Sequence, residues 1–153
     1  MYIMDSVIYE DAPRYDVYLK SIMVLPVFFI AFAIYYLIVA EFEAATTMLA
    51  ATLLMAAIFW AIFPRKYIVL DSKFKIALGG PFSVNVPFDN LETATKPEGL
   101  TIGFNFATCF SNNRTVQITR KKGWHVNITP TDRDLFLEQL NKALNEWRRS
   151  NLR

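Results

Sequence analysis

Two uncharged stretches, residues 21–40 and 44–64, constrain the fold of this chain more than any other feature. Each is about as long as the roughly 20 apolar residues that a helix needs to cross the hydrocarbon core of a bilayer. In lipid, a helix also satisfies the backbone polar groups within its own segment. Only Glu41, Phe42 and Glu43 separate the two stretches. We therefore expect a transmembrane helical hairpin with both tails on the same side of the membrane.

Basic residues flank this predicted hairpin at its open end: Arg14, Lys20, Arg65 and Lys66. The turn contains two carboxylates and no Lys or Arg, so the positive-inside rule predicts that both termini and the folded domain are cytoplasmic. Aromatic residues of the kind found at membrane interfaces lie near the same end: Tyr15, Tyr18, Trp60 and Tyr67. The sequence thus predicts a multi-pass protein of the cytoplasmic membrane.

Two other interpretations of the apolar stretches fit less well. Helices of a soluble core rarely stay free of charge for about 20 residues twice in succession. The first stretch is longer than the apolar region of a signal peptide, follows an acidic segment and ends without a small-residue cleavage motif. Pro26 lies about one turn inside the first stretch, where we expect a tolerated kink.

Charge is distributed unevenly along the chain and supports a division into three parts. Residues 1–20, a cytoplasmic N-terminal tail, have a net charge of −2, and residues 65–153 have a net charge of +6. The second segment is long enough for one modest core and too short for two. In the tail, Pro13 separates a first part, which either pairs with another segment or is mobile, from residues 15–20, which can extend the first helix.

Cysteine and histidine usage excludes several classes of site. One cysteine, Cys109, cannot form an internal disulfide, and with His125 alone it cannot build a metal site. Cys109 lies in an apolar run and is expected to be buried, and His125 is expected at a surface or sheet-edge position. No motif for a nucleophile, a phosphate loop or a cofactor is present, and Gly79-Gly80-Pro81 is typical of a turn. We expect no metal, no cofactor and no enzyme activity.

Small residues dominate the second predicted helix and recur four positions apart. Such spacing lets another helix approach closely, which favours association in lipid. The predicted helix-packing face consists of Thr46 with Ala50, Thr47 with Ala51, and Ala57 with Ala61; Thr52 and Ala56 have the same spacing. Its partner is either the first helix of the hairpin or another membrane protein, including a second copy of this chain.

After Pro64 the pattern changes to short alternating runs that predict about seven antiparallel strands and a final helix. The strands are expected at residues 67–71, 74–78, 82–86, 91–95, 100–106, 114–120 and 124–129. Thr131 and Asp134 resemble a capping box at the start of the helix. An apolar stripe for the sheets follows it: Phe136, Leu140, Leu144 and Trp147.

This combination resembles the membrane-anchored form of the bacterial pleckstrin-homology-like (bPH) domain family. The similarity lies in residues 67–71 at the membrane exit, residues 86–92 with their apolar-Pro-x-x-x-Leu pattern, and residues 126–132 leading into 136–140. It covers roughly residues 65–147, and the aromatic segment 104–110 departs from it. The resemblance implies an α+β fold, with a PH-like antiparallel barrel or sandwich and a C-terminal amphipathic helix, that binds or assembles rather than catalyses.

The feature most suggestive of a binding site is a basic cluster at the tip of a predicted β-hairpin: Arg120, Lys121, Lys122 and Trp124. Such a tip suits anionic lipid headgroups or an acidic protein surface, and it is equally consistent with a solvated turn. Lys73 and Lys75 would add to it if they faced the same way. Arg65 and Lys66 alone join helix to domain, so the domain needs no lipid affinity to reach the membrane.

The sequence therefore favours a membrane-anchored scaffold or binding module that docks a membrane-protein partner or self-assembles. The alternative is a sensor of anionic lipid headgroups at the cytoplasmic face. Nucleic acid is not expected as a partner, because one basic cluster is a small footprint and a membrane-fixed domain cannot search.

Overall fold

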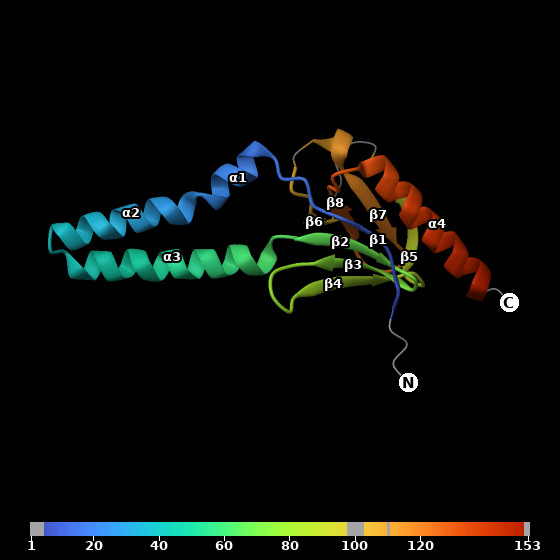
Figure 1. Ribbon diagram of the computed structural model, residues 1–153, viewed down its shortest axis with the longest axis horizontal. Helices are drawn as coiled ribbons and strands as arrows, with labels where there is room; N and C mark the ends of the chain where they lie inside the picture. The colour runs from blue at the N-terminus through green and yellow to red at the C-terminus, as the bar shows by residue number, and fades with distance from the viewer. Residues whose placement is uncertain (1–4, 98–102, 110, 152–153) are drawn as a thin grey trace.

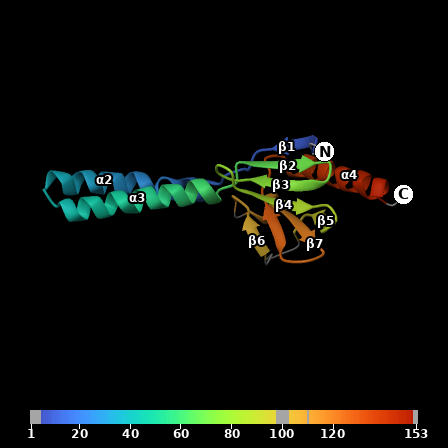
Figure 2. The ribbon, with the colours of Figure 1, turned by 90° about the horizontal axis from the view of Figure 1, so that it is seen from below.

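The computed structural model describes residues 5–97, 103–109 and 111–151, and it consists of a long helical hairpin and a domain of two sheets and one helix (Figure 1). The hairpin comprises α1 (Val17–Met23), α2 (Leu25–Ile38) and α3 (Phe42–Ile62). It projects from one end of the domain, and the described residues before and after it lie on the domain side (Figures 1 and 2). The predicted placement of both tails at the open end of the hairpin agrees with this arrangement.

The first apolar helix begins earlier than the uncharged stretch and is interrupted. Asp16 caps α1 by accepting a hydrogen bond from the Tyr18 amide, and the helix breaks at Val24. Pro26 lies in the first turn of α2, where its missing N–H costs little. The predicted kink is thus a break just before Pro26. The connection between α2 and α3 comprises residues 39–41, with Ala40 at φ 60°, so Phe42 and Glu43 belong to α3 and not to the turn as predicted.

The two helices of the hairpin bury little of their apolar surface. The segments Val17–Ile38 and Phe42–Ile62 are each long and apolar enough to cross a bilayer, yet only 6% and 11% of their most apolar windows are buried. Ala33 on α2, and Ala45 and Thr52 on α3, are buried, while large side chains such as Leu53 remain 71% exposed. The core of the domain therefore does not account for the hydrophobicity of the hairpin.

The first sheet contains a strand from the N-terminal tail. Its order is β1 (Val7–Asp11), β2 (Lys66–Leu70), β3 (Lys73–Ala77) and β4 (Ser83–Pro87), all antiparallel. Of the two possibilities left open for the residues before Pro13, pairing is the one observed. The hairpin is consequently inserted between the first and second strands, and the folded domain includes residues on both sides of it.

The second sheet has the order β5 (Leu91–Thr95), β7 (Val116–Arg120), β8 (His125–Ile128) and β6 (Gly103–Phe106). A short 3-10 helix, η1 (Asn112–Arg114), precedes β7. Strand β6 runs parallel to β8, so the prediction of purely antiparallel strands is wrong for this pair. The segment before Gly103 lies outside the described residues.

The two four-stranded sheets do not close into a barrel (Figure 2). Strands β4 and β5 are consecutive but belong to different sheets, and β1 occupies the far edge of the first sheet. Helix α4 (Arg133–Asn151) packs against β1, β2 and β5 on the open side of the sandwich. The predicted α+β class is correct, and the barrel alternative is replaced by an open two-sheet sandwich covered by a helix.

The core lies between the sheets and α4. Phe136, Leu140 and Leu144 of the predicted stripe are buried, and Trp147 packs at its margin. The Phe136 ring lies 5.8 to 6.2 Å, centroid to centroid, from the rings of Tyr9, Tyr67 and Phe74. Aromatic side chains from β1, β2, β3 and α4 thus form one cluster, and the predicted stripe is confirmed.

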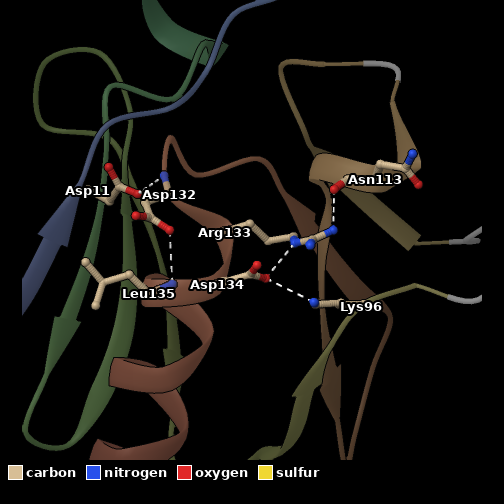
Figure 3. Close-up of polar contacts among 7 residues, drawn as sticks. All are labelled: Asp11, Lys96, Asn113, Asp132, Arg133, Asp134 and Leu135. Carbon is tan, nitrogen blue, oxygen red and sulfur yellow. Dashed lines mark hydrogen bonds and ion pairs between the residues drawn. The ribbon is translucent and has the colours of Figure 1, made fainter.

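The N-terminus of α4 is capped by Asp132 and not by the predicted Thr131 and Asp134 pair (Figure 3). The Asp132 carboxylate accepts from the Leu135 amide at 3.1 Å, and the Asp132 amide donates to Asp11 of β1 at 3.0 Å. The Thr131 hydroxyl instead donates to the Ala12 carbonyl. The segment that follows β1 thus takes Thr131 as a partner, which the sequence spacing could not show.

Asp134 helps to connect the start of α4 to neighbouring segments of the domain (Figure 3). Its carboxylate lies 3.0 Å from Arg133 Nε and 3.1 Å from Lys96 Nζ, and Arg133 also donates to the Asn113 carbonyl. Arg133 first, and then Lys96, lower the pKa of Asp134 below its usual range. The start of α4 is therefore tied to residues following β5 and to η1.

Candidate functional site

The junction between hairpin and domain is fixed through the N-terminal linker, residues 12–16. The Arg14 amide donates to the Thr129 carbonyl at 2.9 Å, and the Asp16 amide donates to the Thr108 carbonyl at 3.0 Å. The Tyr15 hydroxyl donates to the Pro64 carbonyl at 2.5 Å, across the two chain segments that enter and leave the hairpin. Both ends of the hairpin are thus attached to the domain and to each other.

A buried polar cluster supports this linker. The Tyr67 hydroxyl donates to the Phe106 carbonyl, and the Thr108 amide donates to Thr129 Oγ1 at 2.8 Å. The Thr108 hydroxyl donates to the Arg14 carbonyl at 2.7 Å. Burial raises the pKa of Tyr67 far above its ordinary value, so its hydroxyl stays protonated and acts as a structural donor. The segment after β6, unplaced by sequence, therefore anchors the linker.

Trp60 in the last turn of α3 lies against the β3–β4 turn. A Cβ added to Gly79 would lie 1.6 Å from the Trp60 carbonyl oxygen, and Gly80 has φ +59°. Gly79 is needed because the backbone of α3 approaches this turn too closely for any side chain. The predicted turn is confirmed, and it is also a contact between domain and hairpin.

An open apolar hollow of about 740 Å³, the junction groove, lies where these segments meet. Its lining comes from the linker, from the α1–α2 break and from the end of α3: Ala12, Pro13, Tyr15, Met23, Pro26, Ala56, Phe59, Trp60, Phe63, Pro64 and Arg65. The Arg65 guanidinium lies 5.7 Å from the centroid of the Trp60 ring. Burial raises the pKa of Tyr15 to about 12 despite the nearby Arg65. The groove is apolar with one cation at its rim.

The basic tip, residues 120–124, forms the β7–β8 turn. Arg120 Nε donates to the Trp124 carbonyl at 2.6 Å, and its guanidinium lies 6.0 Å from the Phe104 ring centroid. The Trp124 side chain is 62% exposed and lies beside Phe104, with ring centroids 6.5 Å apart. The four predicted residues are brought together, but Arg120 is engaged in holding the turn.

The position of the basic tip follows from its contacts with Asn90. The amides of Lys121 and Lys122 donate to the carbonyl and side-chain oxygens of Asn90 at 2.8 and 2.9 Å. Asn90 follows β4, which starts beside the Gly79 turn at the hairpin and runs away from it. Five strand residues span roughly 16 Å. The basic tip therefore lies at the end of the domain away from the hairpin.

Lys73 and Lys75 belong to the other sheet. They alternate along β3 with the buried Phe74 and Ile76, which places both on its outer face. Lys73 pairs with Asp5 at 2.5 Å, and this partner, together with Ser72, lowers the pKa of the Asp5 carboxyl. Lys73 thus serves to attach the N-terminal segment.

The predicted helix-packing face lies mostly outside the hairpin. Ala45 and Thr52 are the buried residues of α3, whereas Ala51 and Ala61 are half-buried. The remaining predicted members are exposed, and we refer to them as the outer face: Thr46, Thr47, Ala50 and Ala57. Ala45 and Thr52 are seven residues apart, and this spacing was the sequence signal for the face of α3 that packs within the hairpin. The outer face remains the candidate for a further partner.

Cys109 and His125, the two residues considered for a metal site, have different environments. Cys109 is buried, as predicted. His125 was expected at a surface or sheet-edge position; it begins β8, an inner strand between β7 and β6, and it is neither fully buried nor fully exposed. Among the described residues, no group of three or more His, Cys, Asp or Glu side chains is arranged to hold a metal.

No family model, curated protein or solved structure matches this chain. The resemblance to the bPH family consequently stays a prediction from the motifs. The linker and the junction groove were missed by sequence reasoning. The available signals were Trp60 and Arg65 at the helix end and the paired glycines, Gly79 and Gly80.

Proposed function

We propose that this chain is a membrane-anchored binding or scaffold module that docks a membrane-protein partner or copies of itself. The hairpin would cross the cytoplasmic membrane, with both tails and the folded domain on the cytoplasmic side. Support for spanning comes from the exposed apolar surface of α2 and α3, which a soluble monomer would leave in water. A cleaved signal peptide fits poorly, because cleavage after the first helix would also remove β1 from the first sheet.

The observation that carries the proposal is the fixed junction between hairpin and domain. Hydrogen bonds through Arg14, Tyr15 and Asp16, together with the contact of Gly79 on Trp60, give the domain one orientation relative to the helices. A domain held this way presents constant surfaces to a neighbour. The outer face of α3 offers a second surface, with small side chains that permit close helix approach.

The hydroxyls on the outer face are already satisfied within α3. Thr46 Oγ1 donates to the carbonyls of Phe42 and Glu43, and Thr47 Oγ1 donates to Glu43. A partner helix would therefore pack against methyl groups and backbone without leaving a buried donor unpaired.

The experiment is purification of the full chain in mild detergent after cross-linking at native expression level, with the mass of the intact complex. We expect either a stoichiometric membrane protein or a defined oligomer. Ala50→Phe and Ala57→Phe on the outer face should dissociate it, and Ala50→Ser and Ala57→Ser, which keep the same side chains small, should not. A chain that is monomeric and without a partner would refute the proposal.

The alternative, headgroup sensing by the basic tip, has less support because the tip lies at the end of the domain away from the hairpin. Charge reversal at Arg120, Lys121 and Lys122 in the full chain tests it. The added anionic vesicles would approach the domain from the cytoplasmic side. Loss of binding to these vesicles favours the alternative. Unchanged binding removes it.

A further inference from the structure

We propose that the junction groove binds one anionic phospholipid of the surrounding membrane, with an acyl chain between the helices and the phosphate at Arg65. This inference rests on the spanning of the membrane by the hairpin and not on any protein partner. The basic tip plays no part in it.

The shape of the groove follows from the break at Val24. Figure 1 shows α1 tilted away from the end of α3, so the two helices separate where they approach the domain. Met23 and Pro26 line one side of the groove, and Ala56 and Phe59 line the other. Its volume of about 740 Å³ lies within the range of about 300–1,000 Å³ typical of ligand sites.

The walls and the rim differ in chemistry. The side of the groove between the helices is apolar, which suits a hydrocarbon chain. At the domain end, Arg65 is exposed and its guanidinium lies on the Trp60 ring. Tryptophan and arginine at the end of a membrane helix are typical of the headgroup level. A single molecule that is apolar at one end and anionic at the other matches both parts.

Charge complementarity favours an anionic headgroup over a neutral one. The carboxylate of Glu10, on the neighbouring strand β1, is paired with Lys66 at 2.7 Å. Within the described part of the chain, no carboxylate forms an ion pair with Arg65. The Tyr15 hydroxyl in the same lining donates to the Pro64 carbonyl and stays protonated because burial raises its pKa. Arg65 therefore supplies the charge that a phosphate would meet.

Tryptophan fluorescence offers a direct test. The chain has three tryptophans, and Trp60 lines the groove, whereas Trp124 and Trp147 lie in the folded domain. The full chain is placed in phosphatidylcholine nanodiscs with a minor fraction of lipid brominated on its acyl chain. The brominated lipid is either phosphatidylglycerol or phosphatidylcholine, and Trp60→Phe identifies the quenched residue.

We expect enrichment of the brominated phosphatidylglycerol at Trp60 by about fivefold, the attraction of one basic residue for an anionic surface. Arg65→Gln should remove the enrichment, and Lys121→Gln, a basic residue at the far end of the domain, should retain it. Ala56→Phe should also remove it by filling the groove, while Ala57→Phe, on the outer face, should not.

Equal quenching by the two brominated lipids would overturn the proposal, and so would an enrichment that survives both Arg65→Gln and Ala56→Phe. Complete absence of quenching by either lipid would also overturn the proposal, because an acyl chain in the groove would lie beside Trp60. A hairpin that does not span the membrane would be recognised separately, by equal labelling of cysteines at its turn and in the domain, so the two failures are distinguishable.

Discussion

Helices α3 and α4 are of similar length, 21 and 19 residues, but their apolar side chains lie in opposite environments. Helix α4 carries most of its large apolar residues on one face, and that face is buried against the sheets. Helix α3 is apolar on all sides, and most of its surface is exposed. An amphipathic helix needs a domain to pack on, whereas a helix that is apolar all round needs an apolar solvent or further helices.

The largest expected effect separates buried from exposed aromatic residues. Phe136→Ala should destabilise the domain by about 3–5 kcal/mol, because it removes the ring shared by Tyr9, Tyr67 and Phe74. Phe32→Ala, a substitution of the same kind at an exposed site of α2, should leave the free energy of unfolding of the domain nearly unchanged. Denaturation followed through tryptophan fluorescence in detergent measures both. Similar losses in the two variants would contradict the comparison.

A charge placed in each helix tests the comparison next. Leu53→Arg puts a cation on an exposed site near the middle of α3 and should cost about 3 kcal/mol of membrane insertion. Leu135→Arg at an exposed site of α4 should cost little. The measurement is the fraction of chain retained in alkali-washed membranes. Full retention of Leu53→Arg would argue that α3 does not face lipid.

The start of α4 gives a smaller effect. Asp132→Ala removes the carboxylate that accepts from the Leu135 amide and should cost about 1 kcal/mol of stability. Asp134→Asn removes the exposed ion pair with Lys96 and should have the smaller effect of the two. Thermal unfolding of both variants decides between them. A larger loss for Asp134→Asn would favour the capping box expected from sequence.

The smallest expected effect is on thermal stability at low pH, through the carboxyl group of Asp5. Lys73 and Ser72 lower the pKa of Asp5 below its ordinary value of 3.8, so the folded state favours the charged carboxylate. Its contribution to stability is present above about pH 3.8 and is lost as the pH falls through the lower folded value. The wild-type chain should therefore lose its advantage in Tm over Asp5→Asn below that pH. An advantage that persists at lower pH would contradict this role of Asp5.

Sequence patterns predicted the elements better than their connections. The apolar stretches located α2 and α3, and alternation located β5 at its observed bounds, because both patterns arise from local geometry. The pairing of β1 with β2 was left open, since the two strands are separated by the whole hairpin. The parallel β6–β8 pair was missed for the same reason: strand direction depends on contacts remote in sequence.

The candidate site shows the same division. Residues 120–124 are contiguous, so the basic tip was visible from sequence, but its distance from the hairpin depends on the contact with Asn90. The junction groove joins Tyr15, Pro26, Trp60 and Arg65 from three segments. No spacing rule connects them. On α3, a four-residue spacing selected the outer face, whereas the hairpin packs through Ala45 and Thr52, seven residues apart.

Accessibility of single cysteines in intact bacterial cells tests the central claim most directly. Glu43→Cys, at the start of α3, and Glu146→Cys, on the exposed side of α4, are compared with the unsubstituted chain, whose Cys109 is buried. A maleimide that does not cross membranes should label Glu43→Cys in intact cells and Glu146→Cys only after permeabilisation. Labelling of Glu146→Cys alone would invert the orientation. Equal labelling of both positions under each condition would contradict a hairpin that spans the membrane.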